Sequence, residues 1–161
     1  MTPAPRTDVF VELHVPDLGA AKAFYRRFKF AVVREEVADG GDGYLVMGRG
    51  SSLIFFWGGT EAVRDHEYFR RFRSVRKRGY GVELVIPVDD LDEAYRAAVA
   101  AKCVVAEPRT RAWGSRDFRV EDPFGFYLRF TEPHDPTRRS VPRPAARRPK
   151  TERAARARRR P

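Results

Sequence analysis

The sequence predicts an α+β fold of two tandem βαβββ modules, followed by a disordered basic C-terminal tail. Three observations lead to this fold class: an internal repeat, two-residue alternation in the strand segments, and helical periodicity after acidic capping residues. The chain has 161 residues, of which 42% are hydrophobic, so it is long enough to bury a core of ordinary size.

The repeat relates VFVELHVPDLGAAKAFY, near the start, to GVELVIPVDDLDEAYRAA in the middle of the chain. The offset that places Asp17-Leu18 on Asp90-Leu91 also places FAVV (30–33) on CVVA (103–106), YLVM (44–47) on DFRV (117–120) and LIFFW (53–57) on FYLRF (126–130). A constant offset over these segments indicates two copies of one supersecondary unit. We expect a first module at residues 8–57, a partly helical linker at 58–81, a second module at 82–132 and a tail at 133–161.

Each module begins with a strand and a helix. The first strand places Val9, Val11, Leu13 and Val15 on one face and Phe10, Glu12 and His14 on the other. Its equivalent carries Val82, Leu84, Ile86 and Val88 on one face. The helices should begin after Asp17 in the first module and after Asp89 or Asp90 in the second, because aspartate is a favoured N-cap residue.

Alternation assigns two faces to the remaining strands. The helix-facing set is predicted to be Leu45, Met47, Leu53, Phe55, Trp57, Phe118, Val120, Phe126, Leu128 and Phe130. The outward set is predicted to be Tyr44, Val46, Ile54, Phe56, Asp117, Arg119, Tyr127 and Arg129. The outward set mixes aromatic, aliphatic and charged side chains, and that composition is typical of a ligand cleft.

Most of the net charge of +10 lies in the tail. Residues 134–161 hold 11 Lys and Arg against 2 acidic residues, whereas residues 1–133 hold 21 against 20. Such a tail either solubilises the protein or contacts nucleic acid nonspecifically. The sequence has no apolar run long enough to span a membrane, and it starts without a hydrophobic signal segment. Its one cysteine, Cys103, favours a reducing cytoplasm.

These features resemble the vicinal oxygen chelate superfamily, which includes glyoxalase I, extradiol dioxygenases and bleomycin-resistance proteins. The resemblance covers residues 8–132 and rests on HVPDLGAAKAFY, GVELVIPVDDLDEAY and WGSRDFRVEDPFGFYLRF. The last two segments are most similar to the bleomycin-resistance branch, whose members bind a ligand without catalysis. The resemblance implies that the two modules form a curled, cup-shaped mixed sheet, with the cup formed either within one chain or between two. It also implies a homodimer.

In the metal-dependent members of that superfamily, each module supplies two ligands to the ion. The resemblance places these positions at Phe10, Phe56, Glu83 and Arg129. A divalent ion needs several His, Asp, Glu or Cys donors, and only Glu83 is one. We therefore expect no metal, no cofactor and no catalytic residue. Arg129 should face Glu83 either as a structural ion pair or as a contact to an anionic ligand group.

The sequence thus predicts a non-catalytic, antibiotic-type small-molecule binding protein in which rings stack on the ligand and charges orient it. The predicted ligand-binding residues are Phe10, Glu12, Tyr44, Phe56, Glu83, Trp113, Arg119, Tyr127 and Arg129. Trp113 would line the cleft rim or a dimer contact, or else belong to a satellite core. Two alternatives are an enzyme with an off-pattern metal at Glu12, His14 and Glu83, and a protein whose tail carries the main function.

Overall fold

The computed structural model describes residues 9–38, 42–58, 66–72, 78–112, 114–135 and 137. The first half of the chain forms β1 (Val11–Val15), α1 (Leu18–Arg26), β2 (Ala31–Val37), β3 (Gly43–Arg49) and β4 (Ser52–Gly58). A short 3-10 helix, η1 (Phe69–Phe72), follows within the predicted linker. The second half forms β5 (Glu83–Pro87), α3 (Leu91–Ala100), β6 (Val104–Thr110), β7 (Arg116–Glu121) and β8 (Tyr127–Thr131).

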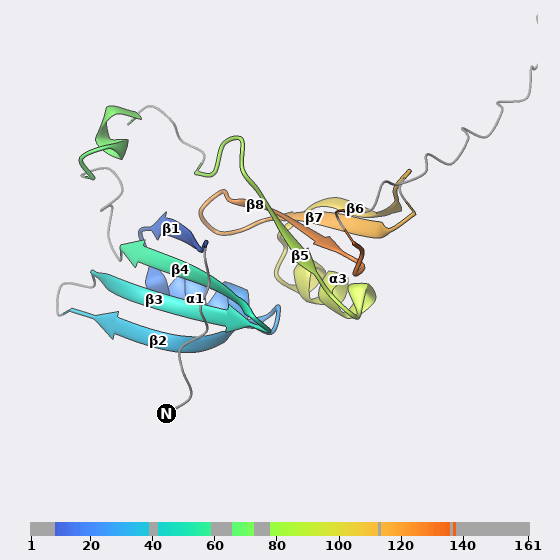
Figure 1. Ribbon diagram of the computed structural model, residues 1–161, viewed down its shortest axis with the longest axis horizontal. Coiled ribbons are helices and arrows are strands. Elements are labelled where there is room, and N and C mark those ends of the chain that lie inside the picture. The colour runs from blue at the N-terminus through green and yellow to red at the C-terminus, as the bar shows by residue number, and fades with distance from the viewer. Residues whose placement is uncertain are drawn as a thin grey trace, which may run out of the picture.

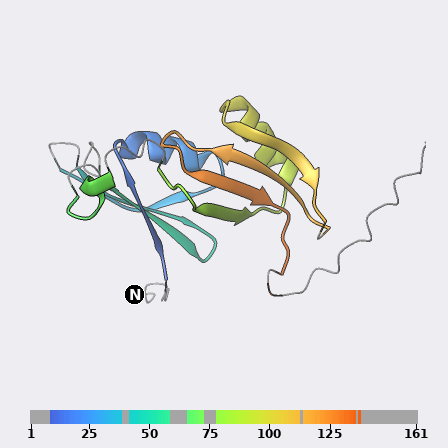
Figure 2. The same ribbon diagram turned by 90° about the horizontal axis from the view of Figure 1, so that it is seen from above.

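The strands form two separate four-stranded mixed sheets with the same topology. Their strand orders are β1-β4-β3-β2 and β5-β8-β7-β6, and in each sheet the first pair is parallel and the others are antiparallel. Each helix covers one face of its own sheet (Figures 1 and 2). The predicted α+β class is therefore confirmed. None of the helices in the described ranges is both long and apolar enough to cross a membrane.

The repeat extends to the ends of the two helices. The Asp17 carboxylate accepts a hydrogen bond from the backbone N–H of Ala20 at 2.8 Å, and the Asp90 carboxylate accepts one from Glu93 at 2.7 Å. Each bond satisfies a backbone donor that the first helical turn leaves free. After the helices, Lys29 and Lys102 both adopt left-handed backbone conformations, with φ of 65° and 54°. Asp90, rather than Asp89, is thus the second cap.

Replacing either capping aspartate by alanine is expected to lower the free energy of unfolding by about 1 kcal/mol. The effects of Asp17→Ala and Asp90→Ala should add, because the two caps belong to different helices. The exposed neighbour Asp89 is the matched control, and Asp89→Ala should change the stability by less than about 0.5 kcal/mol. Urea unfolding followed by circular dichroism measures all three, and equal losses for Asp89 and Asp90 would contradict this assignment.

One hydrophobic core joins the two modules. Phe28, just after α1, packs on Phe130 of the second sheet with ring centroids 4.4 Å apart. In the same core, the buried Tyr25 hydroxyl donates to Asp122 Oδ2 at 3.1 Å. The core residues lie on the helix-covered faces of both sheets. The opposite face of each sheet, here called the outer face, therefore contributes little to this core.

The predicted orientation of β4 is wrong. Phe56 is fully buried with its ring centroid 4.9 Å from that of Tyr25, and Ile54 is also buried in the core. By alternation, Leu53, Phe55 and Trp57 lie on the outer face instead. The reason is a difference in pairing between the two hairpins. Leu45 pairs with Phe56, whereas its equivalent Phe118 pairs with Phe130, so the repeat offset grows by a single position after the turn. Such a shift sends every side chain of a strand to the opposite face.

The C-terminal tail, from residue 138 onward, lies outside the described residues, and so does Trp113. The predicted tail disorder and the predicted role of Trp113 both stay predictions.

Candidate functional site

The predicted site residues divide between the outer faces of the two sheets. The first face carries Phe10, Glu12, His14, Tyr44, Phe55 and Trp57. The second face carries Glu83, Val85, Asp117, Arg119, Tyr127 and Arg129. Two predicted residues are missing from these faces: Phe56, which belongs to the core, and Trp113, which is not described.

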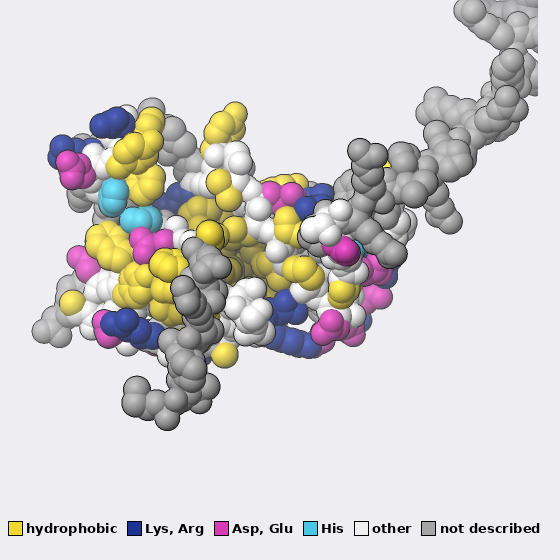
Figure 3. Space-filling model, viewed as in Figure 1, with side chains coloured by type: hydrophobic (Ala, Val, Ile, Leu, Met, Phe, Trp, Pro, Cys, Tyr) yellow, Lys and Arg dark blue, Asp and Glu magenta, His cyan; other side chains and the backbone are white. Residues whose placement is uncertain are grey.

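The first face is an exposed cluster of aromatic rings. Phe10 stacks on Phe55 with centroids 4.2 Å apart, and Tyr44 lies 5.7 Å from Phe55. Phe10 and Trp57 are 52% and 39% exposed, so much of this ring surface faces solvent. Figure 3 shows hydrophobic side chains on this side of the molecule together with nearby histidine and acidic groups. A contiguous apolar surface of this kind typically marks a binding site.

A hydrogen-bonded chain crosses the first face beside the rings. The Tyr44 hydroxyl donates to Glu12 Oε2 at 3.1 Å, and His14 Nε2 lies 3.2 Å from Glu12 Oε1. Burial lowers the pKa of His14 below its ordinary value, although Glu12 acts in the opposite direction. Burial and the Glu12 contact also raise the pKa of Tyr44. Both shifts favour the neutral forms of the His14 and Tyr44 side chains.

The segment around η1 covers His14. The rings of His66 and Phe69 both have centroids 5.1 Å from that of His14, and Trp57 lies 5.4 Å away. The His14 side chain is only 14% exposed, although it lies next to the last residue of β1. No signal in the sequence pattern identifies this cover, because η1 is distant from β1 along the chain.

The second face carries a network of alternating charges, here called the arginine cluster. Glu83 lies between two arginines: its Oε1 is 3.0 Å from Arg119 Nε and its Oε2 is 3.5 Å from Arg129 Nε. Arg119 also contacts the fully buried Asp117. Arg111 adds a third guanidinium, 2.6 Å from the same Asp117 oxygen. The predicted contact between Glu83 and Arg129 is present, and Arg119 shares it.

The arginine cluster is not neutral. It contains three guanidinium groups, from Arg111, Arg119 and Arg129, and two carboxylates, from Asp117 and Glu83. These charges leave a net +1 on side chains that are no more than 33% exposed. Arg111 and Asp117 belong to the cluster because the turn before β7 brings the Arg111 side chain to Asp117. Neither residue is among the ligand-binding residues predicted from the sequence.

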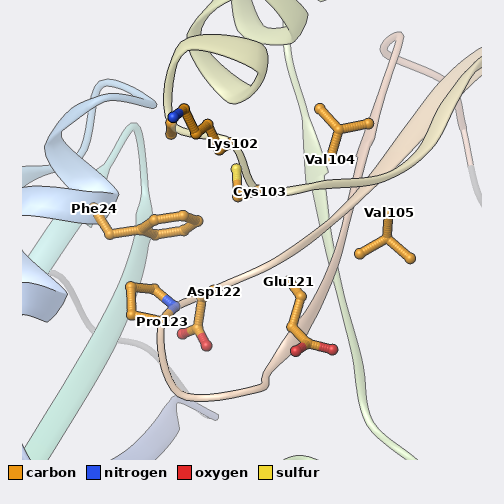
Figure 4. Close-up of a pocket in the computed structure, with 9 residues that line it drawn as sticks. Phe24, Lys102, Cys103, Val104, Val105, Glu121, Asp122 and Pro123 are labelled. Carbon is orange, nitrogen blue, oxygen red and sulfur yellow. The ribbon is translucent and has the colours of Figure 1, made fainter.

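Two hollows among the described residues lie close to the second face or to the contact between the modules. One of about 460 Å³ is lined by Glu83 and Tyr127 of the second face and by residues 78–82 before β5. The other, of about 380 Å³, lies where the modules meet, between Phe24 of α1, the start of β6 and the β7–β8 turn (Figure 4). Cys103 lines the second hollow, and burial raises the pKa of its thiol, which disfavours the reactive thiolate. The first hollow is the one that adjoins predicted site residues.

The off-pattern metal site is not assembled in the single chain. Glu12 and His14 are in contact on the first face, but Glu83 lies on the other sheet and pairs with arginines. Within the part of the chain that the structure describes, no group of three or more His, Cys, Asp or Glu side chains is placed to hold an ion. The prediction that Glu12, His14 and Glu83 hold a metal together is therefore wrong for a single chain.

Paired βαβββ modules with mixed sheets and open outer faces define the class of protein to which this chain is similar. The chain belongs to the glyoxalase/bleomycin resistance protein/dioxygenase superfamily, whose family model matches residues 9–130. The predicted superfamily is confirmed. No curated protein matches the sequence closely.

Solved structures with the same fold include enzymes and binding proteins. A family enzyme from Burkholderia phytofirmans is 19% identical, with a TM-score of 0.61 over 76% of this chain and 95% of that chain. A bleomycin-binding protein complexed with bleomycin is 20% identical, with a TM-score of 0.51 over 80% and 100%. A lactoylglutathione lyase from Agrobacterium tumefaciens is 23% identical, with a TM-score of 0.54 over 80% and 96%. At these identities the likeness shows the fold alone.

The register of the strands corrects the four positions that the resemblance assigns to metal ligands. Because the offset is larger by a single position on the last strand, the equivalent of Arg129 is Phe55 and not Phe56. The four positions are therefore Phe10 and Phe55, which stack, and Glu83 and Arg129, which form an ion pair. Two phenyl rings and a guanidinium cannot coordinate a divalent ion, so these residues do not fit the family's metal.

Proposed function

We propose that this protein binds a small amphipathic, antibiotic-type molecule without catalysis, as bleomycin-resistance proteins do. One observation carries the proposal: a ring stack and an ion pair occupy the positions that hold the metal in related enzymes. A stacked pair of rings suits an aromatic ligand, and partly buried charges suit its orientation. The ligand would contact Phe10, Glu12, Tyr44 and Phe55 on the first face, and Glu83, Arg119, Tyr127 and Arg129 on the second.

The same proposal includes a homodimer with two clefts. The outer faces lie on different sheets, and each leaves hydrophobic side chains exposed, such as Phe10 on the first and Val85, at 41%, on the second. Pairing the first face of one copy with the second face of another would cover both. Glu12 on the first face and the net positive arginine cluster on the second are complementary in charge, which favours this pairing.

A cytoplasmic location and a nonspecific contact between the basic tail and nucleic acid remain predictions from composition. Removing residues 134–161 and measuring nucleic-acid retention at two salt concentrations would test the second.

Ligand binding can be tested through tryptophan fluorescence, because Trp57 lies on the first face. Titration with a panel of aromatic and amphipathic antibiotics, bleomycin included, is expected to shift the emission for at least one compound. The Phe55→Ala variant should bind that compound about tenfold more weakly, since a lost aromatic contact is worth about 1.4 kcal/mol.

The matched control is Val99→Ala, which removes an exposed hydrophobic side chain from α3, away from both outer faces. It should bind like the unmodified protein. A panel in which no compound shifts the emission would count against the proposed function, and so would equal affinities for Phe55→Ala and the unmodified protein.

A further inference from the structure

We infer that the second face contains a binding site for an oxyanion, a carboxylate or a phosphate, held by Arg129 and Arg119. The site would take the anionic end of an aromatic ligand. The inference deepens the proposed function and rests on it for the aromatic part of the ligand. The positive charge and the donors of the site come from the second face alone.

The second face places two like charges side by side. Arg119 and Arg129 are direct cross-strand partners in the β7–β8 pair, so their side chains leave the sheet side by side. Like charges opposite each other in a sheet destabilise it. Among the described residues, the carboxylate of Glu83 is the one that contacts both guanidinium groups. A second anion at this place would relieve the remaining repulsion.

The guanidinium groups of the second face have unused hydrogen-bond donors. A guanidinium offers five N–H donors in a planar fork that matches carboxylate and phosphate oxygens. Arg119 directs its Nε to Glu83 and its Nη1 to Asp117. The Nε of Arg129 approaches Glu83 to 3.5 Å, and it is buried without a hydrogen bond to any described residue. Because no hydrogen bond joins the Nη groups of Arg129 to a described residue and its side chain is 19% exposed, these groups are the donors that remain for a ligand.

The acidic residues of the cluster cannot supply the missing partner. Asp117 is fully buried, and both Arg111 and Arg119 contact the same oxygen, Oδ1. Its other oxygen, Oδ2, is buried and has no hydrogen bond within the described part of the chain, and the ion pairs of Asp117 there are with Arg111 and Arg119. Glu83 already serves two arginines. An oxyanion from outside the chain is the group that would complete this geometry.

The arginine pair is partly exposed, and an aromatic side chain lies beside it on the same face. The side chains of Arg119 and Arg129 are 12% and 19% exposed, so an ion there is partly desolvated and interacts strongly. Tyr127 precedes Arg129 by two positions on the same face and lines the hollow of about 460 Å³. Arg78 and Glu121, which also line it, have opposite charges. An aryl carboxylate or aryl phosphate would place its ring against Tyr127.

Isothermal titration with benzoate, phenyl phosphate and neutral benzamide tests the site. Benzoate or phenyl phosphate is expected to bind at least tenfold more tightly than benzamide, and the better of the two identifies the oxyanion. In Arg129→Gln the preference should fall below threefold. The control Arg96→Gln removes the same charge from the exposed surface of α3 and should keep the full preference.

A second variant guards against a folding defect. Arg129→Lys keeps the positive charge but loses the planar fork, so it should retain only part of the preference for the oxyanion. Equal binding of benzamide and benzoate would overturn the oxyanion site and leave the proposed function standing. A preference unchanged in both Arg129 variants would also overturn it. The oxyanion site would also be overturned if none of the three probes binds. The proposed function is tested separately, by the antibiotic panel.

Discussion

Replacing Phe56 by alanine is expected to lower the free energy of unfolding by about 3–5 kcal/mol. The ring is fully buried against Tyr25 in the core that both modules share, so its removal leaves a cavity that the surrounding strands can fill only in part. For a protein of marginal stability such a loss is a large share of the total. Urea unfolding monitored by circular dichroism measures it.

The adjacent Phe55 is the matched control, because it has the same side chain on the same strand and points the other way. Its ring stacks on Phe10 at the solvent-exposed outer face. Phe55→Ala should therefore cost about 1 kcal/mol, the order of one aromatic contact. Its main effect should be on ligand binding. A larger loss of stability for Phe55→Ala than for Phe56→Ala would mean that the strand has the orientation expected from the repeat.

This pair also shows where the sequence pattern fails. The run LIFFW has no polar residue, so its alternation does not identify a buried face, and the constant repeat offset is the only guide. That offset holds through β3, where Leu45 is equivalent to Phe118, and changes at the following turn. A hairpin that differs by a single position keeps the sequence similarity and reverses the strand.

The second face is easier to predict because its charges identify the outer side of each strand. Arg119 and Arg129 alternate with Phe118, Val120, Leu128 and Phe130, and a charged side chain rarely shares the core face with such residues. The contact between Glu83 and Arg129 is expected from the resemblance, which places both residues at metal-ligand positions. The cover over His14 could not be predicted, because His66 and Phe69 reach it through a tertiary contact alone.

The residues that form the core and the residues on the outer faces are separate sets in this fold. The core uses the helix-covered faces, where Phe28 and Phe130 join the modules. Substitutions on the outer faces therefore alter the proposed binding surface at little cost to the core. A ring stack and an ion pair can replace metal ligands in this way without disturbing the packing that defines the fold.

Replacing Asp122 by alanine is expected to cost about 3 kcal/mol, because three donors lose their acceptor. Its Oδ1 accepts from the backbone N–H groups of Phe124 and Phe126 at 2.9 and 2.8 Å, which closes the β7–β8 turn. Its Oδ2 accepts from the Tyr25 hydroxyl at 3.1 Å, which joins that turn to α1. Asp122→Asn keeps the turn acceptor and should lose about half as much in thermal or urea unfolding.

The dependence of stability on pH distinguishes burial of Asp122 from a simple turn contact. Burial raises the pKa of Asp122 above its ordinary value of 3.8, although the Phe126, Phe124 and Tyr25 donors act to lower it. Just above pH 3.8 the native state therefore keeps a proton that the unfolded chain has released, so the contribution of Asp122 to stability falls as pH rises through the folded pKa. Asp122→Asn has no such proton. Its stability relative to the unmodified protein should rise as the pH increases from about 4. Parallel urea midpoints over that window would show that the carboxyl titrates normally.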